Sequence, residues 1–104
     1  MSRKGVLILF FDLPMVNGAD RKRYRDFMKC IKHMGYMMLQ ESVYIKVVRN
    51  IERIDNDERY LRNEIGENGN VYLLPIRVNT FSHIITISGN FINTDALISD
   101  IIAI

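Results

Sequence analysis

The first apolar run of the chain is VLILFF, Val6–Phe11, and Asp12 follows it at once. An unbroken apolar run of this length is typical of a strand that is buried on both faces. We therefore predict a first strand over Val6–Asp12. The segment LPMVNGA comes next and is predicted to be a loop, because Pro14 and the pair Asn17-Gly18 are turn signals.

Helical spacing begins after this loop and continues to about Met34. Asp20 can cap this helix, and Gly35 supplies its stop. From Tyr36 to Val48 the sequence is extended, but strands are usually only about 5–6 residues long. We therefore predict a turn near residues 40–42 with a short strand on either side. The apolar stripe of the helix consists of Tyr24, Phe27, Met28, Ile31 and Met34.

The second half of the chain repeats this alternation of helix and strand. Asn50 can cap a second helix that ends before GENGN. Two further strands, VYLLPIRV and HIITIS, flank the loop NTFS, and Pro75 places the first of them at a sheet edge or at a bulge. The order β-α-β-β-α-β plus one extra C-terminal strand predicts an α+β, ferredoxin-like fold. Both of its helices cover one face of an antiparallel sheet. The second helix carries Ile51, Ile54, Leu61 and Ile65.

Both faces of the first strand are apolar. Val6, Ile8 and Phe10 point one way with Asp12, and Leu7, Leu9 and Phe11 point the other way. Two helices can bury only one of these rows, so the other row requires a second layer. The pattern favours a second copy of the chain packed face to face. The alternative is that the tail, residues 90–104, folds back over the domain formed by residues 1–89.

Composition places the chain in the ordinary globular class, with 104 residues, 48% apolar and 25% charged. The net charge of +2 is too small to imply a polyanionic partner by itself, so the positions of the charges matter more. Cys30 is the single cysteine, which excludes an intramolecular disulfide and any cysteine-based zinc motif. There is no secretory pattern and no run of transmembrane length, so we expect a cytoplasmic protein without a membrane partner.

Asp12 is the first candidate site residue, because it stands at the carboxyl end of the predicted central strand. A carboxylate beside a proline loop often accepts backbone N–H bonds in a turn, which is the structural alternative. The functional alternative is a ligand for magnesium, which takes oxygen ligands from one or two carboxylates, water and phosphate. One aspartate is too few to fix the ion, but two copies of Asp12 at a dimer axis would be enough.

The first predicted helix is strongly basic, with six basic residues and two acidic ones. Positive side chains recur every three or four residues and form one stripe away from the apolar face. Such a stripe suits contact with nucleic-acid phosphates, although a solvated helix face would look the same. The stripe consists of Lys22, Arg25, Lys29 and Lys32.

Three segments, LILFFDLP, RKRYRDFMKCIKHMGYMMLQESVY and GNVYLLPIRV, together resemble a known family. It is the family of small CRISPR-associated adaptation proteins, the second of the two near-universal CRISPR proteins, in the version that accompanies type II systems. The resemblance covers Gly5 to Gly89. It implies a homodimer of ferredoxin-like domains that bridges two dimers of the larger CRISPR integrase subunit during capture of double-stranded DNA.

The resemblance also implies roles for particular residues. The metal-binding aspartate of the family ends the first strand, so Asp12 is the expected catalytic and magnesium-binding residue. The phosphate contacts of the family come largely from the first helix, and the matching positions here are Arg21, Lys22, Arg25 and Lys29. In the family, the edge that Pro75 marks pairs with the last strand of the other protomer. The tail, residues 90–104, is expected to dock on the partner protomer or on the integrase subunit.

Two functions follow, and they belong to different classes. The first is a non-catalytic adaptor that holds the spacer-precursor duplex, and the second is a magnesium-dependent endonuclease acting on RNA or double-stranded DNA. The sequence offers no second acidic residue and no general base at an obvious position, which favours the adaptor. A third interpretation, a small-molecule sensor, lacks a ligand signature.

Overall fold

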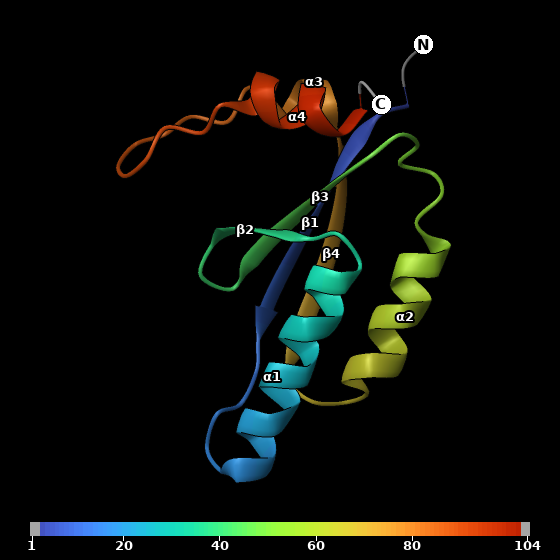
Figure 1. Ribbon diagram of the computed structural model, residues 1–104, viewed down its shortest axis with the longest axis vertical. Helices are drawn as coiled ribbons and strands as arrows, with labels where there is room; N and C mark the ends of the chain where they lie inside the picture. The colour runs from blue at the N-terminus through green and yellow to red at the C-terminus, as the bar shows by residue number, and fades with distance from the viewer. Residues whose placement is uncertain (1–2, 103–104) are drawn as a thin grey trace.

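A four-stranded antiparallel sheet and two long helices form the frame of the molecule (Figure 1). The computed structural model describes residues 3–102. The strand order is β2-β3-β1-β4, so the predicted ferredoxin-like arrangement is confirmed. The elements are β1 (Gly5–Asp12), α1 (Gly18–His33), β2 (Met37–Gln40), β3 (Val43–Val48), α2 (Asp55–Ile65), β4 (Asn70–Arg77), α3 (Val78–Phe81) and α4 (Thr94–Ile102).

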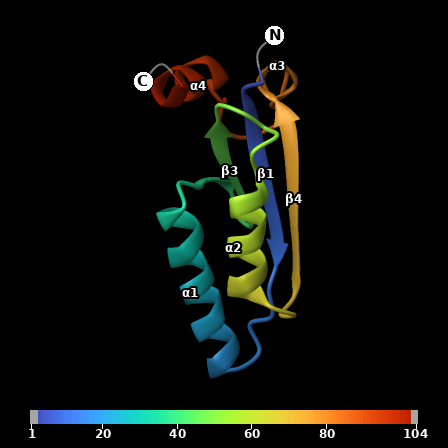
Figure 2. The same ribbon diagram turned by 90° about the vertical axis from the view of Figure 1, so that its right-hand side faces the viewer.

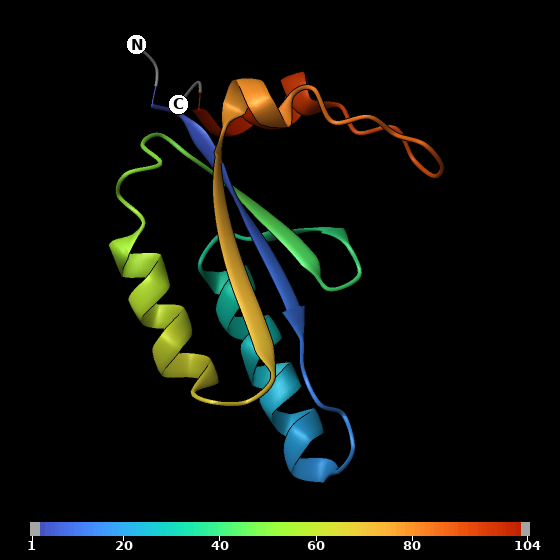
Figure 3. The same ribbon diagram turned by 180° about the vertical axis from the view of Figure 1, so that it is seen from behind.

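The strand β1 lies between β3 and β4 and pairs antiparallel with both. Its first residue, Gly5, lies opposite Val48 and Arg77, and its last residue, Asp12, lies opposite Asn70. The strand β4 lies at the edge of the sheet, as Pro75 predicts. Figure 3 shows this edge strand from the side opposite to Figure 1.

The start of α1 differs from the prediction. The N-cap is Asn17, not Asp20, because the Asn17 side chain accepts a hydrogen bond from the Asp20 backbone N–H at 2.8 Å. The Asp20 carboxylate accepts the Asn17 N–H in return, at 3.4 Å. Asp20 is therefore the third helical residue of a capping box. The predicted stop is confirmed, since Gly35 has a φ of +99° and the Tyr36 N–H bonds back to the Ile31 carbonyl at 2.9 Å.

The predicted break in the extended segment is confirmed, and the predicted start of the second helix is wrong. Ser42, with a φ of +65°, stands in the turn between β2 and β3. Asn50 does not cap α2, because its side chain accepts a hydrogen bond from the Glu52 N–H at 2.9 Å in a local turn. The helix α2 begins at Asp55, and its N-cap is Ile54, four residues after Asn50.

The segment after β4 also differs from the prediction. The first three residues of the predicted loop NTFS lie in the short helix α3, with Ser82 in the turn that follows, and the predicted strand HIITIS, residues 83–88, is not a strand. A strand needs a neighbouring strand for its backbone bonds, and none of the described residues pairs with this segment. Its side chains Ile85 and Ile87 are 79% and 91% exposed. Figure 3 shows the connection between α3 and α4 extending away from the body of the molecule.

The helices α1 and α2 cover one face of the sheet, which we call the helix face (Figure 2). The ring of Phe27 meets the ring of Phe11 edge to face, with centroids 5.3 Å apart. A polar clamp closes the rim, since Asp57 on α2 accepts hydrogen bonds from Tyr36 at 2.8 Å and from Lys46 at 2.9 Å. The buried core of this face consists of Leu7, Leu9, Phe11, Phe27, Ile31, Tyr36, Tyr44 and Leu61.

The opposite face of the sheet, which we call the open face, has only half a cover. At the start of β1, Phe81 from α3 is buried against Val6, and Leu97 and Ile98 from α4 pack on the same cluster. In Figure 1, β3 runs between α4 above and α1 below. At the other end of β1 the cover is incomplete, since Phe10 is 36% exposed and Tyr72 beside it is 65% exposed.

The tail thus folds back over part of the sheet, as one of the two alternatives for the second layer requires. Its docking on another chain stays a prediction, and residues 1, 2, 103 and 104 of the predicted segments lie outside the described residues. In the part of the chain that the structure describes, no helix has the length and apolar character needed to cross a membrane.

Candidate functional site

Asp12 lies at the end of β1, on the open face. Strand residues alternate between faces, and the helices cover the row of Leu7, Leu9 and Phe11. Asp12 therefore belongs to the row that faces away from α1 and α2, two positions after Phe10, and its side chain is exposed. Across the ladder it lies opposite Asn70 of β4.

The carboxylate of Asp12 has no structural partner within residues 3–98. No backbone N–H or basic side chain of these residues bonds to it, so the alternative of a turn carboxylate is not supported. The carboxylate is consequently available to a ligand that approaches the open face.

The backbone of Asp12 is held by a close approach of Gly69. A Cβ at Gly69 would lie 2.6 Å from the Asp12 carbonyl oxygen and 3.0 Å from a side-chain carbon of Leu13, and the φ of Gly69 is +76°. Only glycine fits this combination of conformation and space. The sequence marked GENGN as a turn but gave no sign that its second glycine touches the Asp12 backbone.

Among the described residues, the donor atoms of a single chain do not complete a magnesium site at Asp12. No group of three or more His, Cys, Asp and Glu side chains that could hold a metal occurs among the described residues. The residue opposite Asp12 is the amide Asn70, not a second acid. A second carboxylate at this position would have to come from another molecule.

The four residues expected to contact phosphate are all on α1 and all exposed: Arg21, Lys22, Arg25 and Lys29. Lys22 forms an ion pair with Asp26 at 2.8 Å. The hydrogen bond that Lys22 donates lowers the pKa of the Asp26 carboxyl, and the nearby charges of Lys29 and Arg25 lower this pKa further. Neither Arg25 nor Lys29 is paired with an acid among the described residues, so the stripe retains a positive field.

The structure does not bring the basic stripe and Asp12 together. The opposite side of α1, with Phe27 and Ile31, is buried against the helix face, so the stripe points away from the sheet. Asp12 lies on the other face. A phosphate backbone that follows the exposed side of α1 would therefore lie on the side of the molecule opposite to the face that carries Asp12.

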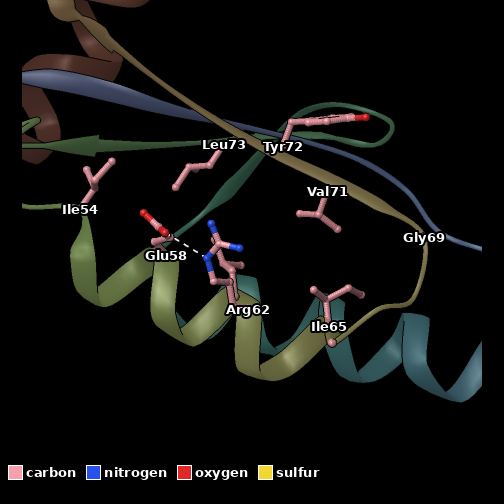
Figure 4. A pocket seen from close by; sticks show the side chains of 10 residues that line it. Ile54, Glu58, Arg62, Ile65, Gly69, Val71, Tyr72 and Leu73 are labelled. Carbon is pink, nitrogen blue, oxygen red and sulfur yellow. Dashed lines mark hydrogen bonds and ion pairs between the residues drawn. The ribbon is translucent and has the colours of Figure 1, made fainter.

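A cleft of about 390 Å³ lies between α2 and β4 (Figure 4). Its walls combine apolar side chains with polar groups, and Glu58 and Arg62 form an ion pair at 3.0 Å along one side. An i,i+4 pair of this kind satisfies its own charges and provides no free acid or base. The cleft borders the open edge of β4, so it suits a segment that would extend the sheet. It is lined by Ile54, Glu58, Leu61, Arg62, Ile65, Gly66, Gly69, Val71, Tyr72 and Leu73.

Comparison with known proteins points to one family. Residues 6–84 match the model of the family described as CRISPR associated protein Cas2. The chain is 30% identical over 93 residues to the CRISPR-associated endoribonuclease Cas2 of Treponema denticola, covering 86% of this chain and 92% of the relative. It is 32% identical over 83 residues to the protein of that name from Streptococcus mutans, covering 80% and 78%. A third relative of the same name, from Ligilactobacillus salivarius, is 34% identical over 68 residues, covering 65% and 67%.

Proposed function

The chain belongs to the CRISPR associated protein Cas2 family, and we propose that it acts in CRISPR adaptation as a homodimeric adaptor that holds double-stranded DNA. The adaptor would bridge dimers of the CRISPR integrase subunit while a new spacer is integrated. One observation supports this role above the others: the exposed basic stripe of α1 points away from the face that carries Asp12. Contact with phosphates on α1 sets position and does not involve chemistry at Asp12.

The open face supports the homodimer. Phe10 and Leu74 are 36% and 46% exposed, and Phe10 lies directly opposite Tyr72 on β4. An exposed apolar patch on a sheet is a suitable surface for a second copy of the same patch, related by a two-fold axis. The pairing would also bring the two Asp12 residues to the same interface, since they lie in the row of Phe10.

The segment between α3 and α4 supports an exchange of strands, in which each copy adds this segment to the sheet of the other. Ile85 and Ile87 are exposed here, and the edge of β4 is open. An extended apolar segment and an open strand edge are complementary, because the edge has unpaired N–H and C=O groups. The predicted strand HIITIS would then form in the dimer, against β4 of the partner.

A second candidate function is a magnesium-dependent endonuclease acting on RNA or double-stranded DNA. The relatives from three bacteria carry the name endoribonuclease, which favours this activity. The dimer would have to supply both carboxylates, one Asp12 from each protomer. Magnesium held there would stabilise the negative charge of a reacting phosphate.

The test is spacer integration in a reconstituted reaction with the cognate integrase. We expect Asp12→Ala to remain a dimer and to support integration, because the adaptor uses α1 and not Asp12. Loss of integration in this variant, with dimerisation and DNA binding retained, would overturn the adaptor and favour the enzyme.

The basic stripe is tested by the double variant Arg25→Ala/Lys29→Ala, which leaves the ion pair of Lys22 with Asp26 intact. Each lost phosphate contact lowers the slope of log affinity against log salt by about 0.9, so we expect a decrease of about 1.8. The double variant Arg59→Ala/Arg62→Ala on α2 removes the same charge and should leave the slope unchanged. Equal slopes for the two variants would exclude α1 as the DNA surface.

A further inference from the structure

Five basic residues from three separate segments meet at the end of the sheet where β1 begins. We call this group the sheet-end cluster, and we propose that it is a second contact site for the phosphate backbone of nucleic acid, separate from the stripe on α1. The inference rests on the proposed function for the identity of its ligand. The cluster consists of Arg3, Lys4, Arg49, Arg53 and Arg77, all of which are exposed.

Backbone pairing brings the three segments together. Gly5 lies opposite Val48 and Arg77, so the residues beside it on all three strands share one end of the sheet. The Val78 N–H donates to the Lys4 carbonyl at 3.2 Å, and the Ile51 N–H donates to the Arg3 carbonyl at 2.9 Å. The positions of the five residues are therefore set by the sheet and its continuation, not by the conformations of long side chains alone.

The loop that carries Arg49 and Arg53 is held over the start of β1. A Cβ at Gly5 would lie 1.5 Å from a methyl carbon of Ile51, and 2.7 Å from the Ile76 carbonyl oxygen. The absence of a side chain at Gly5 is what lets Ile51 occupy this space. The loop that carries both arginines is consequently docked on the sheet, with its backbone bonded to that of Arg3.

The cluster has more basic than acidic residues, and the excess charge rests on Arg49 and Arg53, because Lys4 and Arg77 each make an interaction of their own. Glu52 is the one acidic residue within the segments 3–5, 48–53 and 76–78, and it forms an ion pair with Arg3. Arg49 and Arg53 have no acidic partner among the described residues. Like charges that are gathered at one place repel one another and attract anions from solution, so this surface favours a polyanion.

Phosphate is the anion that fits the cluster best. Four of its five side chains are guanidinium groups, which bind phosphate oxygens in a bidentate manner. The core of a protein interface is usually apolar, and an interfacial helix binds a membrane partly through an apolar face. None of the exposed large hydrophobic residues of the chain lies within residues 3–9, 47–59 or 76–80.

The sheet-end cluster and the basic stripe are different surfaces. The molecule is 44 Å long, and Figure 1, with this axis vertical, shows α1 beginning at the lower end and β1 beginning at the upper end. The helix α1 therefore accounts for contacts near one end, and the cluster adds contacts near the other.

The test compares Arg49→Ala/Arg53→Ala with the matched control Arg59→Ala/Arg62→Ala by fluorescence anisotropy. The probes are a labelled DNA duplex and a labelled single-stranded RNA, each titrated over a series of salt concentrations. In the cluster variant we expect the salt slope to fall by about 1.8 for the DNA duplex and by about 1.4 for the single-stranded RNA, and in the control we expect it to stay unchanged. Adding Arg25→Ala/Lys29→Ala should lower the slope again by a similar amount, because the two surfaces are separate.

The outcomes separate this inference from the proposed function. If the wild-type protein binds DNA and the cluster variant has the slope of the control, the cluster inference is wrong and the adaptor stands. If the wild-type protein binds only RNA, the adaptor is wrong, and the RNA slopes decide the cluster by themselves. Binding of neither probe at low salt overturns both. An unchanged slope together with weakened binding of the integrase would make the cluster a protein contact and overturn the phosphate assignment.

Discussion

The two faces of the sheet are built from the same strands, but other parts of the chain cover them to different extents. On the helix face, every apolar residue of β1 is buried under α1 and α2, and the polar clamp on Asp57 closes the rim. On the open face, burial is complete only at the start of β1, and Phe10 and Tyr72 at the other end remain in contact with solvent. One side of β1 thus lies in a fully buried core, and its other side lies in a core that is only partly covered.

The difference in burial between the two faces assigns them different roles, one in folding and one in binding. Burial of large apolar side chains is the main source of folding free energy, and the helix face obtains it within a single chain. The open face leaves similar side chains uncovered, which is costly in a monomer and favourable in a complex. We therefore expect substitutions on the helix face to change stability and substitutions on the open face to change association.

The largest effect is expected for Phe27→Ala on the helix face. Phe27 is 1% exposed and packs edge to face on Phe11, so its removal leaves a cavity in the core. The free energy of unfolding should fall by about 3–5 kcal/mol, measured by urea denaturation. A cost below about 1 kcal/mol would mean that the helix face is not the principal core.

A smaller loss of about 2 kcal/mol is expected for Gly69→Ala, which places a methyl group against the backbone of Asp12. Gly35→Ala is the control, because Gly35 also has a positive φ but the nearest atom to its added Cβ is 3.8 Å away, on the flexible side chain of Lys46. The difference between the two losses in urea denaturation measures the close approach at Asp12. Equal losses would show that only the backbone conformation matters.

On the open face, Tyr72→Ala should weaken the dimer by about tenfold, which corresponds to about 1.4 kcal/mol. Sedimentation velocity over a range of concentrations measures the change. Tyr60→Ala on α2 is the matched control, since the exposed fractions of the two tyrosines are 63% for Tyr60 and 65% for Tyr72. If Tyr60→Ala weakens the dimer and Tyr72→Ala does not, the proposed interface is on the wrong face.

The smallest effect is expected for Tyr36→Phe, which removes one hydrogen bond to Asp57 and should cost about 1 kcal/mol at neutral pH. Burial raises the pKa of the Tyr36 hydroxyl, and the bond to Asp57 raises it further. The folded state therefore keeps this proton when the unfolded chain loses it, and the stabilisation by Tyr36 falls as the pH rises above about 10.

The unfolding free energies of wild type and Tyr36→Phe should consequently converge at alkaline pH. A constant difference between them in urea titrations from pH 7 to pH 11 would show that Tyr36 ionises equally in both states.

Local patterns were sufficient for much of the fold. The apolar run of β1, the helical stripe of α1 and the stop at Gly35 are each encoded by neighbouring residues, and the structure confirms all three. The predictions that fail depend on partners elsewhere. HIITIS alternates as a strand does, but a strand also needs an edge to pair with. Asn50 resembles a helix cap, but it lies in a loop. The side chain of Ile51 holds this loop against Gly5.

The candidate site was predictable only in part, for the same reason. The exposure of Asp12 and of the stripe on α1 follows from position within one element, whereas their functions remain predictions. The sheet-end cluster joins residues 3, 49 and 77, which no periodic pattern connects, and only the pairing of β1 with β3 and β4 brings them together.

The outward direction of the basic stripe has a consequence for avidity. Two copies that join through their open faces would carry two stripes, each on the outer side of the pair. A duplex that is held by one stripe would meet the second at an effective concentration on the order of millimolar, provided that it is long enough to reach. Binding strength should therefore rise steeply at one duplex length, and that length would measure the distance between the two helices.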